Sequence, residues 1–447
     1  MSQRQPAQPK SVLRGHRTQV HVTTFIRSNQ RLASGDADGF VILWDLTIMR
    51  PRAVWRAHTN AILGISDWGN DKIITHGRDN RIVVWKLDSK DESVMSTALP
   101  LDESAPERPQ PWILHILEVN ALNFCSFSYC ATGPDLTPDE LLIAVPNTLK
   151  TEAVDIFQLP NQTRQFTVNL GRGTEEKGMV MSLRLFWLEG CLTLAAAYES
   201  GLALVVQLRR GETWDVLYRA QAHSQPVLSL DVAPHKDFFL TSGADAVIVK
   251  HPIPTAGFPV GELQHLRQAD SRSTKAPNPS LLSTAFSSES KPAITHKQTE
   301  PVIETQPLKT INTKHSGQQG LRIRSDGKIF ATAGWDSKVR VYSAKTMSEL
   351  AVLKWHEVGC YAVAFATLID GQALDPAEPN APNEANENLE KGIRTANVPG
   401  SHDVTTKMVV PKLGQLSVKD RRIKMAKEAH WLAAGSKDGK ISLWDIY

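Results

Sequence analysis

The sequence is poor in cysteine, with only Cys125, Cys130, Cys191 and Cys360 among its 447 residues. Four cysteines are too few for a disulfide scaffold, and their spacings lack the close pairs of a zinc site, so we expect reduced thiols and no metal. The formal charge is only +3, far below the basic excess typical of nucleic-acid binding. A polar N-terminus and the lack of any apolar run of about 18 residues indicate neither secretion nor membrane insertion.

A short pattern repeats along the chain: a turn of small residues, an aspartate, an alternating strand and then a tryptophan. It reads SGDADGFVILWDL at 34–46, THGRDNRIVVWKL at 75–87 and AAGSKDGKISLWDI at 433–446. Each aspartate precedes its tryptophan by six residues, in the pairs Asp38 and Trp44, Asp79 and Trp85, and Asp438 and Trp444. Two further copies pair Asp245 with His251 and Asp336 with Tyr342 at the same spacing.

A histidine lies 21 or 22 residues before four of these aspartates, at His16, His58, His223 and His315. Two weaker copies, at 119–159 and 180–208, keep the strand rhythm without the histidine. The pattern resembles the WD-repeat family of β-propellers, in which each repeat of about 40 to 45 residues forms a four-stranded antiparallel blade. We therefore expect an all-β fold, a single seven-bladed propeller over residues 1–447 with insertions at about 88–111, 253–306 and 369–428. The first two insertions are rich in Ser, Pro and Lys, which favours disorder.

The two ends of the sequence each hold part of a blade. The segment KSVLRGH (10–16) supplies an outer strand with no blade before it, and KISLWDIY (440–447) is a third strand without an outer partner. We expect these strands to pair and close the ring, because an open edge would favour aggregation.

His16, Ser34 and Asp38 contain the residue types of a hydrolase triad. The same types recur with the period of the repeat, however, which predicts a buried polar network and no catalytic residues, cofactor or enzyme activity. Ala434 at the hydroxyl position predicts a weaker network in the last blade. The expected network residues are His16, Ser34, Asp38, Trp44, His58, Thr75, Asp79, Trp85, His223, Thr241, Asp245, His315, Thr332, Asp336, His356, Asp438 and Trp444.

The residue before each turn aspartate should point outward and offer a docking surface, formed by Trp335, Lys437, Ala37 and Arg78 on consecutive blades. Tryptophan and arginine are enriched in interface hot spots. The alternative interpretation is that Trp335 packs on a neighbouring loop and Arg78 is a solvated residue of the rim. The basic run KDRRIKMAK (419–427) indicates either a nuclear import signal or an exposed helix.

The segments VLRGHRTQVHVTTFI, LASGDADGFVILWDL, AHTNAILGI and WLAAGSKDGKISLWDIY, together with the long late insertion, resemble the fungal ASTRA-associated protein 1 family. The resemblance implies a non-catalytic scaffold subunit of the nuclear ASTRA complex, linked to chromatin remodelling and to maturation of phosphatidylinositol-kinase-like kinases. It implies other subunits of that complex as partners, and no nucleic acid, membrane or small-molecule substrate.

Two other uses of WD-repeat proteins remain as alternatives. Substrate receptors of cullin-type ubiquitin ligases often carry an arginine two residues after the Trp-Asp pair, and here Thr47 and Tyr447 stand at those positions. Signalling subunits like the G-protein β chain carry coiled-coil heptads before the first blade, which this sequence lacks. Both alternatives therefore rank below the scaffold subunit.

Overall fold

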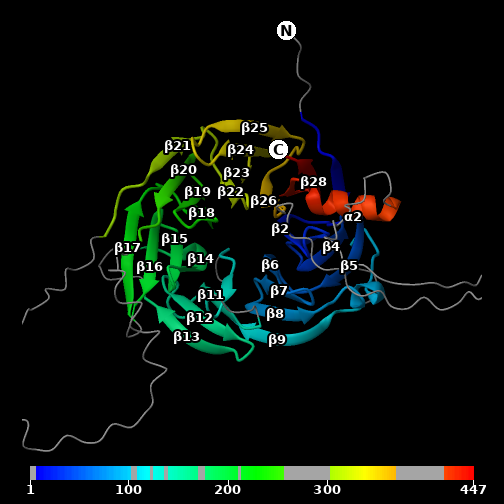
Figure 1. Cartoon of the computed structure of the whole chain (residues 1–447), viewed down its shortest axis with the longest axis horizontal. Coiled ribbons are helices and arrows are strands. Elements are labelled where there is room, and N and C mark those ends of the chain that lie inside the picture. The colour runs from blue at the N-terminus through cyan, green and yellow to red at the C-terminus, as the bar shows by residue number, and fades with distance from the viewer. Residues whose placement is uncertain are drawn as a thin grey trace, which may run out of the picture.

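Seven four-stranded antiparallel sheets surround a central opening in the computed structural model (Figure 1). The structure describes residues 7–101, 108–120, 124–134, 139–169, 177–209, 213–255, 303–368 and 417–446. The predicted seven-bladed β-propeller is confirmed. Within the described ranges, no helix is long and apolar enough to cross a membrane.

We number the blades in chain order, each from its inner to its outer strand. Blade 1 holds β2 (Val20–Ile26), β3 (Arg31–Asp36), β4 (Phe40–Asp45) and β5 (Arg50–Arg56). Blade 2 holds β6 (Ile62–Trp68), β7 (Lys72–Gly77), β8 (Arg81–Lys86) and β9 (Trp112–Glu118). Blade 3 holds β10 (Ser128–Ala131), β11 (Leu141–Pro146), β12 (Val154–Leu159) and β13 (Thr163–Val168). Blade 4 holds β14 (Val180–Leu188), β15 (Cys191–Tyr198), β16 (Leu202–Leu208) and β17 (Trp214–Gln221).

The remaining blades follow the same plan. Blade 5 holds β18 (Val227–Val232), β19 (Phe238–Gly243), β20 (Val247–Pro252) and β21 (Lys309–Asn312). Blade 6 holds β22 (Gln318–Ile323), β23 (Ile329–Gly334), β24 (Lys338–Ser343) and β25 (Glu349–Lys354). Blade 7 holds β26 (Cys360–Phe365), β27 (Trp431–Ser436), β28 (Lys440–Asp445) and β1 (Ser11–Arg14). The described helical segments are η1 (Asp91–Val94) and α2 (Val418–Glu428).

The hydrophobic core lies between neighbouring blades. Both faces of a blade are covered, so second strands such as β23 and β27 are buried along their whole length and consist of small and apolar residues. Trp55 of blade 1 meets Trp85 of blade 2 edge to face, with ring centroids 6.2 Å apart. Each blade therefore depends on its neighbours for burial.

The ring closes through blade 7, as the sequence predicts. β1 pairs antiparallel with β28, and Ser11 lies opposite Leu443 while Arg14 lies opposite Lys440. The Leu13 side chain in this strand is buried among residues of blades 7 and 1. The two distant ends of the sequence thus form one sheet, which covers the edge of β28.

The two faces of the ring differ in their connections. Loops that enter the first strands, with His16, His58, His223 and His356, lie on one face together with the turns between second and third strands; we call it the histidine face. The other two kinds of connection, which carry the insertions, lie on the opposite face, here called the insertion face. This division follows from the antiparallel order of every sheet.

Part of the first insertion is folded, and the expectation of disorder is wrong for residues 88–101, which we call the strap. Glu92 in η1 has a side chain with no exposed surface, and its carboxylate receives hydrogen bonds from Arg27, Arg31 and Arg52. The Arg31 Nη2 contact is 2.9 Å long and the Arg52 Nε contact 3.2 Å. Three guanidinium groups offset the burial of this carboxylate, which composition alone does not indicate.

The strap then follows the outer edge of blade 1 to the closing blade. Val54 N of β5 donates to Ser96 O at 2.8 Å, and Leu101 N donates to Gly15 O at 3.2 Å. Leu101 is buried in the same cluster as Leu13. The second and third insertions lie mostly outside the described residues.

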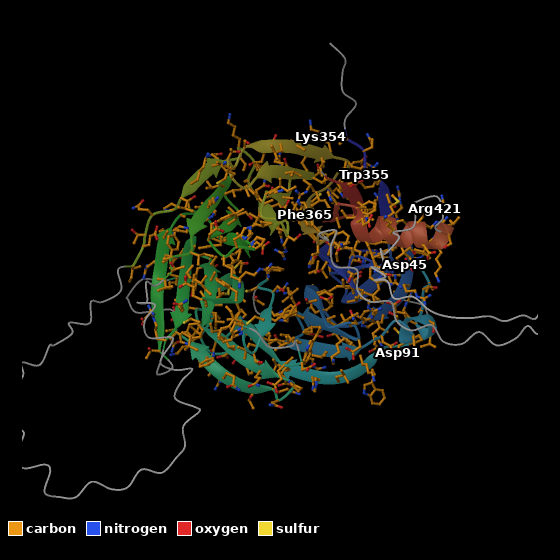
Figure 2. All side chains as sticks on the ribbon, viewed as in Figure 1. Asp45, Asp91, Lys354, Trp355, Phe365 and Arg421 are labelled. Atoms are coloured by element: carbon orange, nitrogen blue, oxygen red, sulfur yellow. The ribbon has the colours of Figure 1, made fainter. Side chains whose placement is uncertain are left out.

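The basic run 419–427 lies in α2, as one of the two interpretations expects. The helix begins after Ser417, whose Oγ accepts from Asp420 N at 3.1 Å. Only Ala426 of the helix is buried, and Asn29 Nδ2 from the β2–β3 turn donates to Lys427 O at 3.1 Å. Figure 2 shows Arg421 at the periphery of the ring.

Removal of residues 1–14 should lower the thermal midpoint by about 10 °C or more and promote aggregation. The deletion takes away the hydrogen bonds to β28 and the burial of Leu13, at about 1 kcal/mol per net bond, against a total stability of about 5–15 kcal/mol. Differential scanning fluorimetry and size-exclusion chromatography measure both effects. Removal of residues 1–6 alone is the matched control and should leave the midpoint unchanged; equal stability of both truncated forms would refute the closure.

Candidate functional site

Blade 2 contains the complete polar network that the repeat predicts. His58 Nδ1 lies 2.8 Å from Asp79 Oδ1, and His58 Nε2 lies 2.8 Å from Thr75 Oγ1. Trp85 Nε1 donates to the same Thr75 hydroxyl at 2.8 Å. The network joins the entry loop, the second strand, the turn and the third strand of the blade.

Blade 5 extends the same network into its neighbour. His223 Nδ1 lies 3.0 Å from Asp245 Oδ1, and His223 Nε2 lies 2.8 Å from Thr241 Oγ1. His251, at the tryptophan position, lies 2.7 Å from that hydroxyl and 2.8 Å from Tyr218 Oη in blade 4. Burial lowers the pKa of His251 well below its usual value, so it joins the chain as a neutral ring.

In blade 1 the carboxylate of the network is Asp36, which corrects the prediction of Asp38. His16 Nδ1 lies 2.7 Å from Asp36 Oδ2, and His16 Nε2 lies 2.7 Å from Ser34 Oγ. Trp44 Nε1 donates to Ser34 Oγ at 2.8 Å, as expected. Asp38 contributes only its backbone N–H, which donates to Asp36 Oδ1 at 3.0 Å.

The position two residues after the hydroxyl explains this difference. In blade 2 it is Gly77, and a Cβ there would lie 2.4 Å from the His58 ring. Only a glycine leaves room for the later aspartate to reach the histidine. In blade 1 the side chain of Asp36 fills that space itself. The signal was present in the sequence, where SGDADG has aspartate in place of this glycine.

Blade 6 builds its network mainly from other residues, and His315 reaches it only through a long contact to Asp336. Thr332 Oγ1 donates to Gln318 Oε1 at 2.7 Å, and Arg340 holds Asp336 through two bonds of 3.1 and 2.6 Å. The His315 side chain is 42% exposed, and its Nδ1 lies 3.6 Å from Asp336 Oδ2. The charged fork of Arg340 replaces the imidazole as the main partner of the aspartate.

Blade 7 obtains its hydroxyl from the third strand. His356 Nε2 lies 2.8 Å from Ser442 Oγ, and Trp444 Nε1 donates to the same oxygen at 2.8 Å. Asp438 instead accepts from Lys440 Nζ at 2.6 Å, which corrects its predicted bond to the histidine. Among the described residues, His356 Nδ1 has no hydrogen-bond partner, so this network is incomplete as predicted.

One cross-strand position accounts for the departures in blades 6 and 7. Arg340 lies opposite Thr332, and Ser442 lies opposite Ala434. The equivalent residue in blade 2 is the apolar Val83, opposite Thr75. A polar residue at this position therefore reaches the network, which the sequence shows only once the strand register is known.

These networks fit a structural role better than a chemical one. The hydroxyl groups of Ser34, Thr75 and Thr241 belong to side chains with 0% exposure, so none of them is placed to attack a substrate. Among the residues that the structure describes, no group of three or more His, Cys, Asp or Glu is arranged to hold a metal ion.

The histidine face presents Trp335 in a fixed position. Trp335 Nε1 donates to Gln319 Oε1 at 2.6 Å, and the side chain remains 47% exposed. Its ring lies over Gly317, where φ is +72° and a Cβ would come within 2.1 Å of the ring atoms. The Trp335 side chain therefore packs on the loop at Gly317 and is also partly exposed to solvent.

Further aromatic groups continue around the opening of the channel. Arg78 lies over the Phe124 ring at 4.5 Å, and Phe124 is 54% exposed. His21 meets Tyr361 edge to face, with ring centroids 6.1 Å apart. We call the set Trp335, Tyr361, His21, Arg78 and Phe124 the aromatic band.

The sequence identified only Trp335 and Arg78 of the aromatic band. Lys437 is exposed, as expected, and Ala37 is half-buried. His21 and Tyr361 each lie five residues after the entry histidine of their blade, a signal that was available. Phe124 precedes β10, a strand without the repeat motif, and gave no such signal.

Comparison with known proteins gives a consistent result. The family model described as ASTRA-associated protein 1 matches residues 9–444 of this chain. A protein of that name from Pyricularia oryzae is 49% identical over 99% of this chain and 98% of its own length. The protein of that name from Verticillium alfalfae is 49% identical over 98% and 93%, and that from Schizosaccharomyces pombe 34% identical over 80% and 93%.

Replacing His58 by alanine should destabilise the protein far more than the same change at His315. His58→Ala leaves Asp79 and Thr75 without their buried partner, at a cost of about 3 kcal/mol, whereas His315→Ala removes a half-exposed ring at about 0.5 kcal/mol or less. Urea unfolding curves of both variants give the comparison. Equal losses would contradict the assignment of the networks.

Stability should fall as the pH drops from 6.5 to 5, and His76 should carry part of this loss. Burial lowers the pKa of His76 to about 3 and that of His356 to about 4. Both rings bind a proton near pH 6.5 only when unfolded, so each costs about 1.4 kcal/mol per pH unit below that value. In His76→Phe the slope of unfolding free energy against pH should be smaller by that amount. Identical slopes in urea titrations would contradict the assignment.

Proposed function

Since the chain belongs to the ASTRA-associated protein 1 family, we propose that it is a non-catalytic scaffold subunit of the ASTRA complex. The observation that carries this proposal is the match over nearly the whole chain to relatives whose name states that association. A rigid propeller with several exposed surfaces suits the task, although the fold alone does not determine it. The burial of the network hydroxyl groups of Ser34, Thr75 and Thr241 supports a role without catalysis.

The proposal extends to the setting of that complex. We place the protein in the nucleus, in chromatin remodelling and in the maturation of phosphatidylinositol-kinase-like kinases, as the sequence resemblance implies. The basic side chains of α2 support nuclear import: Lys419, Arg421 and Arg422 are exposed, and Lys424 and Lys427 are half-buried.

The aromatic band is the proposed docking surface for a protein partner. Tryptophan and arginine are the residues that most often dominate binding energy. Here Trp335 lies in blade 6 and Arg78 in blade 2, and Tyr361 of blade 7 and His21 of blade 1 lie between them in the ring. The polar networks fix the adjoining loops, so little conformational freedom is lost when a partner binds. Trp335 and Phe124 combine large exposed area with defined orientation, through Gln319 and Arg78 respectively.

Trp335→Ala should reduce the recovery of partner subunits without loss of stability. Truncation of a hot-spot tryptophan costs about 2 kcal/mol, or about 30-fold in affinity. The measurement is affinity purification of the tagged full chain from fungal cells with quantitative mass spectrometry, beside thermal unfolding of the variant.

Trp112→Ala is the matched control, because Trp112 is 74% exposed on β9, on the outer edge of blade 2. It should retain the partners. Loss of partners in the Trp112 variant alone would move the docking surface to that edge, and a large drop in melting temperature of Trp335→Ala would make this tryptophan structural. Failure of the unchanged protein to recover ASTRA subunits would refute the proposed function itself.

A further inference from the structure

The central channel of the propeller contains a cavity of about 670 Å³. Its walls are formed by the first strands of the blades, whose side chains surround the central opening in Figure 2. Two arginines line it, Arg184 from β14 and Arg322 from β22, and no aspartate or glutamate is among the lining residues. The cavity therefore has a positively charged wall.

Among the described residues, Asp231 is the carboxylate that contacts these arginines, and both of its oxygens already accept hydrogen bonds. Arg184 Nε lies 3.0 Å from Asp231 Oδ1, and Asp231 Oδ2 accepts from Ile323 N at 2.8 Å. Asp231 is not among the residues that line the cavity. Blades 4, 5 and 6 thus bring together two guanidinium groups and one carboxylate, which leaves one positive charge without a counter-charge.

Most donor groups of the two arginines are available to a ligand. Arg322 Nη1 donates to Leu321 O at 2.7 Å, and within the described part of the chain this is its one hydrogen bond. The two terminal nitrogens of Arg184 have no hydrogen-bond partner among those residues. A guanidinium group carries five N–H donors in a planar fork, so both side chains have unused binding capacity.

The charge on Arg322 also favours an anionic ligand. Burial and the neighbouring charge of Arg184 together lower the pKa of Arg322 to about 10, against the attraction of Asp231. The side chain remains charged at neutral pH, so a bound anion would offset part of the cost of its burial. Thr23 of blade 1, which is 6% exposed and also lines the cavity, has an Oγ1 without a partner among the described residues.

We propose that the channel binds a small phosphate-bearing anion between Arg184 and Arg322. A phosphate group offers several oxygens in different directions, which suits two guanidinium forks from separate blades, whereas one carboxylate satisfies a single fork. This ligand goes beyond the proposed scaffold function and was absent from the sequence-based expectations, which named no cofactor.

Isothermal titration calorimetry of the full chain with sodium pyrophosphate, at ionic strength matched with sodium chloride, tests the site. The unchanged protein should bind with a stoichiometry of one, and Arg184→Gln and Arg322→Gln should each weaken binding by about tenfold or more. Arg56→Gln, at the end of the outer strand β5, is the matched control and should bind as the unchanged protein does.

Two further measurements distinguish a specific phosphate site from loss of folding and from general anion binding. Without pyrophosphate, Arg322→Gln should melt at the same or a higher temperature, because it removes the repulsion from Arg184. Citrate should bind at least about tenfold more weakly than pyrophosphate. No saturable heat, equal weakening in all three variants, or citrate binding as tightly as pyrophosphate would each overturn the proposal.

Discussion

The pairing of β1 with β28 is the contact on which the whole ring depends. Each blade buries its two faces against its neighbours, so a ring that is open at one point exposes two faces and an unpaired strand edge. Four residue pairs between Ser11–Arg14 and Lys440–Leu443 close that gap. Their contribution exceeds the sum of their hydrogen bonds, because they also keep blades 7 and 1 in contact.

The same junction is where the inserted segments fold onto the ring. The strap crosses the outer edge of blade 1 and buries Leu101 beside Leu13, while α2 buries Ala426 in the same cluster. Glu92 fixes the strap through arginines of blade 1. Two segments that interrupt the repeat thus stabilise the junction where the ring closes. The strap does so with a buried carboxylate, that of Glu92, which needs three arginine partners.

The repeat pattern was sufficient to predict the fold, the closure and the complete networks of blades 2 and 5, because strand period and turn chemistry are local properties. It failed where a residue acts across the sheet. Arg340 and Ser442 change their networks from the third strand, and only the register places them opposite Thr332 and Ala434. The sequence shows Asp36 at the position where other repeats have glycine. That Asp36 contacts His16, however, follows only from their distance in the folded chain, which residue spacing does not give. Composition wrongly predicted disorder for the strap. This polar segment is ordered because the buried carboxylate of Glu92 pairs with three arginines.

The channel is the part of the molecule furthest from sequence-based inference. Arg184, Asp231 and Arg322 belong to three different repeats and share no motif, yet the ring brings them to one wall. In a propeller the inner strand of every blade faces the same axis. Charged side chains on different inner strands therefore lie around one channel and interact with one another. The two arginines take no part in the closure of the ring or in the polar networks, and a bound anion would offset the repulsion between them. The two faces and the channel therefore serve separate ends: the insertion face strengthens the closure, the histidine face presents the aromatic band, and the axis offers a site for charge.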